Sequence, residues 1–132
     1  MHATTLHATI LLAHGSRDPQ WKRPVEAVAA RMRELDPLHT VTCAYIENMQ
    51  PDLLACVESL ESLTAQELQS VRIFPLFLGA GKHVREDIGA LAERVRQQYP
   101  KLQVQLIGMM GEHPEFTNLL AQLALTAKAG NR

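Results

Sequence analysis

The sequence is poor in the features that mark special protein classes. Its 132 residues include two cysteines, 5% aromatic residues and a formal net charge of −1 at pH 7. Cys43 and Cys56 belong to no CxxC motif, which favours free buried thiols over a disulfide or a thiolate metal site. The near-neutral charge leaves no basic surface for nucleic acid and no acidic tail. We therefore expect no disulfide framework and no nucleic-acid partner.

Long hydrophobic runs are also missing. No apolar stretch approaches the ~20 residues of a membrane span. The first eight residues lack the basic region and apolar core of a signal peptide. We expect a cytoplasmic protein without a membrane partner. With 46% hydrophobic residues the chain can bury a core, and its length suits one domain, residues 1–132.

The sequence does contain a regular alternation of apolar runs and amphipathic segments. Buried strands are predicted at residues 8–13, 40–46, 71–78 and 102–107. Apolar residues at helical spacing occupy 25–35, 53–63, 84–99 and 116–123. Asp18-Pro19, Pro51 and Pro114 are typical helix starts. Pro75 indicates that the third strand either is an edge strand or ends early.

This order predicts an α/β fold. Strands that alternate with helices form parallel sheets with right-handed crossovers. We expect a flavodoxin-like open sheet of four parallel strands in the order 2-1-3-4, with helices on both faces. Such a unit is about half of a common two-lobed size, and twofold dimers are the commonest oligomers. A homodimer is therefore expected.

Polar residues follow three neighbouring strands of this predicted sheet. His14 follows the first strand, Glu47 the second and His83 the third. In the order 2-1-3-4 these ends lie about 4.8 Å apart, strand to strand, at the edge where open α/β sheets bind ligands. Two imidazoles and a carboxylate suit Co, Ni, Fe or Zn better than Mg or Ca. The competing interpretation, ordinary surface or hydrogen-bonded side chains, stays open on the pattern alone.

Cationic residues stand beside both histidines. Arg17 is close to His14, and Lys82 and Arg85 flank His83. They are either solvated surface charges or groups that attract an anionic ligand, and arginine would hold carboxylates in a bidentate way. The start of the helix after His83 adds free N–H groups and partial positive charge.

Three further residues are candidates at the same edge. Met109 lies just past the fourth strand and would form an adaptable apolar wall. The Ser16 hydroxyl lacks the G-x-S-x-G context of a nucleophile, so we interpret it as a group that caps a turn or orients the loop. His113 is interpreted as a helix-entry residue on the side of the sheet from which the crevice can be reached.

The sequence gives little support for phosphate binding or for phosphatase activity. No GxGxxG or Walker pattern continues Gly79-Ala80-Gly81. Phosphohistidine phosphatases need an arginine just before the histidine, and Ala13 stands there. A flavodoxin-like regulatory or binding domain is a further alternative, although the first strand end has no acidic cluster of the receiver type.

Three segments together resemble the short form of the sirohydrochlorin chelatase family, the CbiX type. The first is Leu12-Ala13-His14-Gly15-Ser16-Arg17, and the second is Tyr45-Ile46-Glu47 with Pro51 after it. The third runs from Pro75 to Ile88 and ends in His83-Val84-Arg85-Glu86-Asp87-Ile88, its most specific part. The resemblance spans almost the whole chain.

The resemblance implies an ATP-independent chelatase that inserts a divalent metal into sirohydrochlorin. Cobalt leads to cobalamin, iron to sirohaem and nickel to a methanogen cofactor. The metal is a substrate, and no tightly bound cofactor is implied. Short members form homodimers with the active site between the protomers, whereas long members carry two lobes in one chain. By this resemblance His14 and His83 are catalytic and metal-binding, and Glu47 completes the site.

The sequence departs from the family pattern at Lys82, where many relatives have glycine, and at Tyr45-Ile46, which replaces a phenylalanine–leucine pair. It has no histidine-rich tail. With the ring's carboxylates as ligands, the expected substrate-binding residues are Ser16, Arg17, Lys82, Arg85 and Met109. The alternative is a metal or tetrapyrrole carrier that uses the same crevice without turnover.

Overall fold

A computed structural model describes residues 5–62 and 67–130. The elements follow the predicted alternation, with two short 3-10 turns, η1 and η2, added. In chain order they are β1 (Thr5–Ala13), η1 (Pro19–Lys22), α1 (Arg23–Leu35), β2 (Thr40–Tyr45), α2 (Leu53–Ser62), β3 (Glu67–Pro75), α3 (Lys82–Gln98), β4 (Gln103–Leu106), η2 (Met110–Glu112) and α4 (Pro114–Thr126). Leu63, the end of the predicted second helix, lies outside the described residues.

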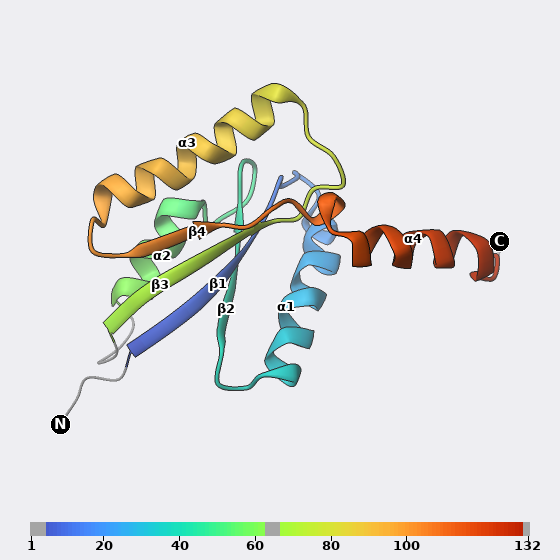
Figure 1. Ribbon diagram of the computed structural model, residues 1–132, viewed down its shortest axis with the longest axis horizontal. Helices are drawn as coiled ribbons and strands as arrows, with labels where there is room; N and C mark the ends of the chain where they lie inside the picture. The colour runs from blue at the N-terminus through green and yellow to red at the C-terminus, as the bar shows by residue number, and fades with distance from the viewer. Residues whose placement is uncertain (1–4, 63–66, 131–132) are drawn as a thin grey trace.

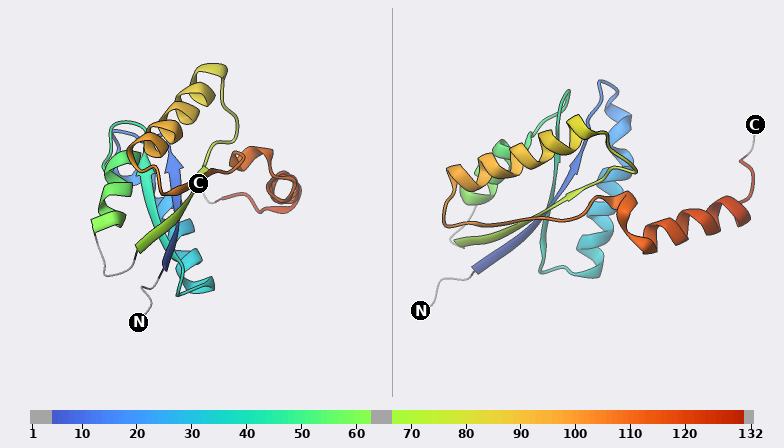
Figure 2. Two further views of the ribbon diagram at one scale, coloured as in Figure 1. Left: turned by 60° about the vertical axis from the view of Figure 1, so that its left-hand side comes forward. Right: turned by 45° about the horizontal axis from the view of Figure 1, so that its top comes forward.

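The strands form one parallel sheet in the order β2-β1-β3-β4, which confirms the predicted topology (Figure 1). The central strand β1 is apolar along residues 8–13 because both of its faces are covered. Ile10 and Leu12 point to the α2 and α3 side, and Leu11 points to the α1 side. Helices therefore lie on both faces, as predicted (Figure 2).

Two element boundaries differ from the sequence-based expectation and bear on the site. The third strand is an inner strand that ends at Pro75 rather than at residue 78. Proline has no N–H to continue the ladder, so the early end is the correct interpretation of Pro75. Helix α3 begins at Lys82, after an extended Gly81. His83 therefore lies in the first turn of α3 and not in the loop before it.

No helix of the described residues combines the length and the apolar character that crossing a bilayer requires.

Both cysteines are free thiols, as predicted from their spacing. Cys56 is buried on α2, with its Sγ 2.8 Å from the hydroxyl oxygen of Thr42. Cys43 is partly buried on β2. Burial raises the pKa of each thiol above its ordinary value of 9.0, because the thiolate loses its hydration. Burial likewise raises the pKa of Tyr45 to about 12.

We expect the free energy of unfolding to fall as pH rises above 9.0. The unfolded thiols ionise near that value while the folded ones remain protonated, so stability is intact below it and is lost above it. Each unit of pKa difference corresponds to about 1.4 kcal/mol. Urea unfolding of the native chain and of Cys56→Ala, from about pH 8 to about pH 10, tests this. Equal pH slopes in the two proteins would refute the assignment to Cys56.

Candidate functional site

The site is built where β1 and β2 end side by side. The ladder between them continues beyond the strands, since Ile46 N–H donates to the Ala13 carbonyl and Glu47 N–H donates to the His14 carbonyl, each at 3.0 Å. His14 and Glu47 are therefore held as neighbours by backbone hydrogen bonds. The sequence predicted their adjacency from strand order, and the structure brings them together.

Gly15 makes this close approach possible. Its φ is +96°, in the region that side chains other than glycine rarely adopt. A Cβ at this position would fall on the carbonyl oxygen of Glu47. This role of Gly15 was not predicted, although a glycine directly after a strand-end histidine is the signal that could have shown it.

The side chains of His14 and Glu47 face each other across a short gap. Nε2 of His14 lies 3.5 Å from Oε1 of Glu47, and the side chains are 47% and 55% exposed. Nδ1 of His14 lies 3.3 Å from the Gly15 carbonyl oxygen. A proton on Nδ1 would donate to that oxygen, and this tautomer turns the Nε2 lone pair toward the carboxylate.

The lone pairs of His14 Nε2 and Glu47 Oε1 face each other, an arrangement that attracts a cation. A gap of 3.5 Å is long for a hydrogen bond between nitrogen and oxygen. It matches two ligands of one ion, because nitrogen and oxygen atoms each ~2.1 Å from a tetrahedral metal lie about 3.4 Å apart. The two atoms are therefore spaced as two ligands of one divalent ion would be.

The rings of Phe77 and His14 form a T-shaped pair, with centroids 6.4 Å apart. Phe77 belongs to the segment between β3 and α3 that leads to His83. This segment is fastened to η2, because Gly111 N–H donates to the Phe77 carbonyl at 2.9 Å, and a Cβ on Gly111 would fall on the Leu78 carbonyl oxygen. The loop before His83 is thus held against η2.

His83 lies at the same edge of the sheet but is not joined to the pair. It is the second residue of α3 and is exposed, and the amino end of α3 lies at the end of the sheet where β1 stops (Figures 1 and 2). Within the described ranges 5–62 and 67–130, no three His, Cys, Asp or Glu side chains are grouped to hold a metal ion. The structure therefore assembles two of the three predicted ligands.

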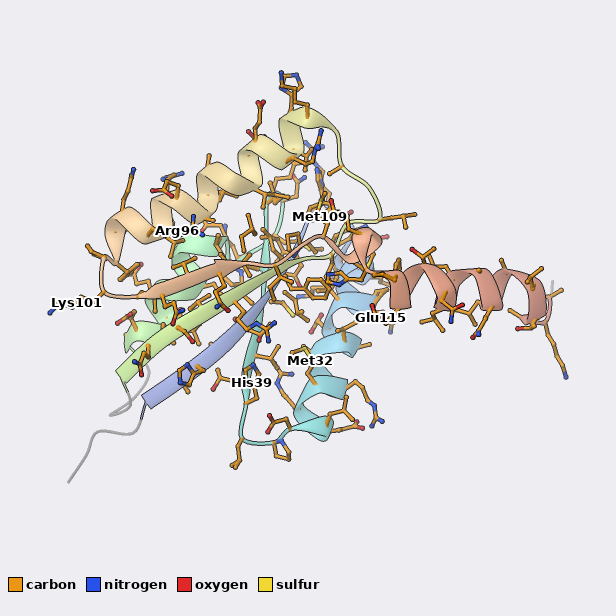
Figure 3. The ribbon with its side chains drawn as sticks, viewed as in Figure 1. Met32, His39, Arg96, Lys101, Met109 and Glu115 are labelled. Atoms are coloured by element: carbon orange, nitrogen blue, oxygen red, sulfur yellow. The ribbon has the colours of Figure 1, made fainter. Side chains whose placement is uncertain are left out.

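The predicted cationic residues have different surroundings. Nζ of Lys82 lies 4.0 Å from Oε1 of Glu86, one helical turn away. Arg85 and Met109 line a cavity of about 220 Å³ at the carboxyl ends of β3 and β4, together with Glu112 (Figure 3 shows Met109). Arg17 is exposed beside the site. Glu112 was missed because the sequence shows no pattern at the turn η2.

Two other predicted residues have local roles. The Ser16 hydroxyl accepts a hydrogen bond from the backbone N–H of Asp18 at 3.1 Å, as expected for a residue that orients the loop. His113 precedes α4 as its N-cap residue, and its Nε2 lies 2.8 Å from the Gly108 carbonyl oxygen. Its ring also meets Phe74 edge-on at 5.4 Å, on the α1 side of the sheet.

The fold and the paired side chains define a small parallel α/β protein with a histidine–carboxylate pair at the carboxyl edge of its sheet. Residues 8–127 match the model of the CbiX family. The chain therefore belongs to the CbiX family.

Relatives and solved structures agree with this placement. The chain is 28% identical over 81 residues to a sirohydrochlorin cobaltochelatase of Methanopyrus kandleri, and 30% identical over 83 residues to one of Methanococcus aeolicus. These matches cover 61% and 63% of this chain and 54% and 56% of the relatives. The chain thus matches about half the length of the curated relatives.

Two solved structures share the fold. A CbiX protein described as a putative cobalamin biosynthesis protein, from Marinobacter aquaeolei, is 28% identical with a TM-score of 0.75, over 90% of this chain and 94% of that one. The sirohydrochlorin chelatase SirB from Bacillus subtilis subspecies spizizenii, in complex with cobalt, is 16% identical with a TM-score of 0.73. The match covers 92% of this chain but 50% of SirB.

Proposed function

We propose that this protein is an ATP-independent chelatase that inserts a divalent metal into sirohydrochlorin. The observation that carries the proposal is the cation-sized gap between Nε2 of His14 and Oε1 of Glu47. The relatives are named sirohydrochlorin cobaltochelatases, and these names indicate sirohydrochlorin as the ring and favour cobalt as the metal. Iron and nickel remain alternatives, because nitrogen and oxygen ligands bind all three and metal choice often follows availability.

The reaction exchanges two pyrrole N–H protons of the ring for one M²⁺ ion. His14 and Glu47 hold the incoming ion on one face of the macrocycle and replace part of its water shell. His83 approaches from the amino end of α3 and completes the ligand set. As the ion enters the ring, an imidazole accepts one departing proton and Glu47 relays the other, both groups being suited to proton transfer.

The surrounding cations bind the carboxylates of the ring, of which sirohydrochlorin has eight. Arg85 offers a bidentate guanidinium at the mouth of the cavity that Met109 also lines. Among the residues that the structure describes, Lys82 is paired only with Glu86, and both side chains are largely exposed. Such surface pairs contribute little stability. Lys82 can therefore exchange this partner for a substrate carboxylate, which also keeps its charge from repelling the metal.

We further propose that two copies pair to form the working crevice. The chain covers 50% of SirB, so one copy corresponds to half of that longer chain. A homodimer restores the second half. It also supplies groups for the open side of a site that, within one chain, assembles only His14 and Glu47 among the described residues.

The test is the absorbance spectrum of sirohydrochlorin with Co²⁺ under anaerobic conditions, with and without catalytic amounts of the protein. We expect conversion to the metallated ring over many turnovers above the spontaneous rate. Parallel reactions with Fe²⁺ and Ni²⁺ rank the metals. A shift that stops at one ring per site would instead indicate a carrier, and no shift would refute the proposal.

Glu47→Gln should weaken Co²⁺ binding by at least about 10-fold, because the amide keeps the shape but loses the charge that faces the ion. Titration of the ring-free protein with Co²⁺, followed by visible absorbance, measures the change. Glu93→Gln is the matched control, since Glu93 is 57% exposed, as Glu47 is at 55%, but lies in the middle of α3 and pairs with Arg96. Equal affinity in the two variants would remove Glu47 from the site.

A further inference from the structure

Trp21 is the single tryptophan of the chain, and it is 39% exposed. It lies in η1, at the edge of the sheet where β1 ends and α1 begins (Figures 1 and 2). Its ring forms a T-shaped pair with the ring of Tyr45, with centroids 6.5 Å apart. Tyr45 is paired in register with Ala13, the residue before His14. The indole is therefore fixed beside the strand ends that carry the site.

A succession of hydrogen bonds sets the path of the chain from His14 to Trp21. The Ser16 hydroxyl accepts from the backbone N–H of Asp18 at 3.1 Å, and the Asp18 carboxylate accepts from the backbone N–H of Gln20 at 2.9 Å. The carbonyl oxygen of Asp18 accepts from the backbone N–H of Trp21 at 3.0 Å. This loop is therefore ordered before any ligand arrives, and a contact made by the indole costs little further ordering.

The two flanks of the proposed ring site differ in chemistry. Lys82, His83 and Arg85 are exposed in the first turn of α3, on one side of the sheet. Trp21 is on the other side, because its partner Tyr45 packs in the apolar cluster under α1. Helices α1 and α3 cover opposite faces (Figure 2). One flank is thus cationic and the other aromatic.

A tetrapyrrole presents two matching kinds of surface. Its carboxylate arms suit the cationic flank, where arginine can bind them in a bidentate way. Its flat, unsaturated core suits an aromatic side chain, which gains both apolar burial and a favourable ring–ring arrangement. Single exposed apolar side chains are common on protein surfaces. Trp21 differs from them because a hydrogen-bonded loop holds it at the ligand-binding edge of the sheet.

We propose that Trp21 is a ring-contact residue, whose indole packs against the tetrapyrrole while the first turn of α3 binds the carboxylates. The inference rests on the proposed function and adds a residue that holds the ring and the direction in which the ring lies across the sheet edge. Trp21 offers no metal ligand and no proton acceptor. It therefore strengthens binding of the ring and leaves the chemical step to His14 and Glu47.

The first experiment measures equilibrium binding of metal-free sirohydrochlorin, followed by the absorbance of the ring. We expect the Kd to be about 10-fold higher in Trp21→Ala than in the native chain, and within about 3-fold of the native value in Trp21→Phe. Leu38→Ala is the control, since Leu38 is also exposed but lies in the turn before β2, at the opposite edge of the sheet. Its Kd should equal that of the native chain.

Two results of this experiment would overturn the proposal, and they differ in what else they remove. Equal dissociation constants for the native chain and Trp21→Ala would overturn the contact by Trp21 and leave the proposed function in place. A native chain that binds no ring would overturn both. Should far-UV circular dichroism show Trp21→Ala to be unfolded, Trp21→Leu takes its place, because leucine keeps an apolar side chain over Tyr45. Its Kd should be at least about 3-fold above the native value.

The second experiment separates a ring contact from a role in the chemistry or in subunit pairing. With Co²⁺ in excess, the KM for the ring should rise about 10-fold in Trp21→Ala while kcat stays within about 3-fold, because the contact is equal in ground state and transition state. Ring-free Co²⁺ affinity and the sedimentation coefficient should match those of the native chain. A lower kcat at native KM, a changed Co²⁺ affinity or a changed sedimentation coefficient would overturn the assignment of Trp21 to the ring.

Discussion

His14→Ala is expected to lower the rate of metal insertion into sirohydrochlorin by at least about 100-fold, because the variant loses both a metal ligand and a proton acceptor. The fold should survive, since the side chain is 47% exposed and its ring meets Phe77 only at a centroid distance of 6.4 Å. The change in the free energy of unfolding should stay near ±0.5 kcal/mol, as for other surface substitutions. Turnover and urea unfolding of the same preparation measure both quantities.

His7→Ala is the control for this variant. His7 belongs to the same strand, β1, but lies at the opposite end of the sheet, where its Nδ1 is 2.6 Å from the Ser70 hydroxyl oxygen. Its removal should leave the rate unchanged. Near-normal turnover in His14→Ala would end the assignment of His14.

His83→Ala is expected to abolish insertion as well. Because His83 has no contact with His14 or Glu47 in this structure, ring-free Co²⁺ binding should change less in His83→Ala than in His14→Ala. Such a difference would show that His83 acts when the ring is bound. Unchanged turnover would place the chemistry on His14 and Glu47 alone.

The second large effect is expected from Gly15→Ala, which should destabilise the protein and disrupt the site together. The added Cβ falls on the Glu47 carbonyl oxygen, and the φ of +96° is strained for alanine. Backbone strain and overpacking each cost about 1–3 kcal/mol. We expect a loss of about 3 kcal/mol or more, and a melting temperature lower by roughly 10 °C. Differential scanning calorimetry and Co²⁺ binding test both consequences.

Gly79→Ala provides the comparison, since a Cβ on Gly79 meets nothing within 4 Å. Its melting temperature should stay close to that of the native protein. If Gly15→Ala were equally stable and bound Co²⁺ normally, the close approach of the β1 and β2 ends would not matter to the site.

The parallel fold could be predicted because its causes are local in the sequence. Continuous apolar runs such as residues 8–13 occur where a strand is covered on both faces, and the alternation with helical patterns leaves few topologies. The effect of proline on strand ends was also predictable from neighbouring residues. Pro75 indicated either an edge strand or an early strand end, and the position of β3 inside the sheet decides for the early end. The start of α3 at Lys82 was missed because the helix begins before its apolar stripe does.

The site was predictable only in outline. Strand order was enough to bring His14 beside Glu47, since the ends of adjacent parallel strands meet at one edge. The 3.5 Å gap, the backbone hydrogen bonds that hold it and the need for Gly15 depend on how two distant loops pack. The same holds for Glu112 beside Arg85.

By itself, the sequence determined the order of elements, the sheet topology, the free thiols and which residues stand at the strand ends, because each follows from neighbouring residues or from connection rules. The tertiary structure decided that His14 and Glu47 form a pair while His83 stands apart, and that α4 extends away from the sheet and buries none of its residues. Distances between loops, and the direction in which a terminal helix departs, depend on contacts between residues far apart in the chain, and no local pattern encodes them.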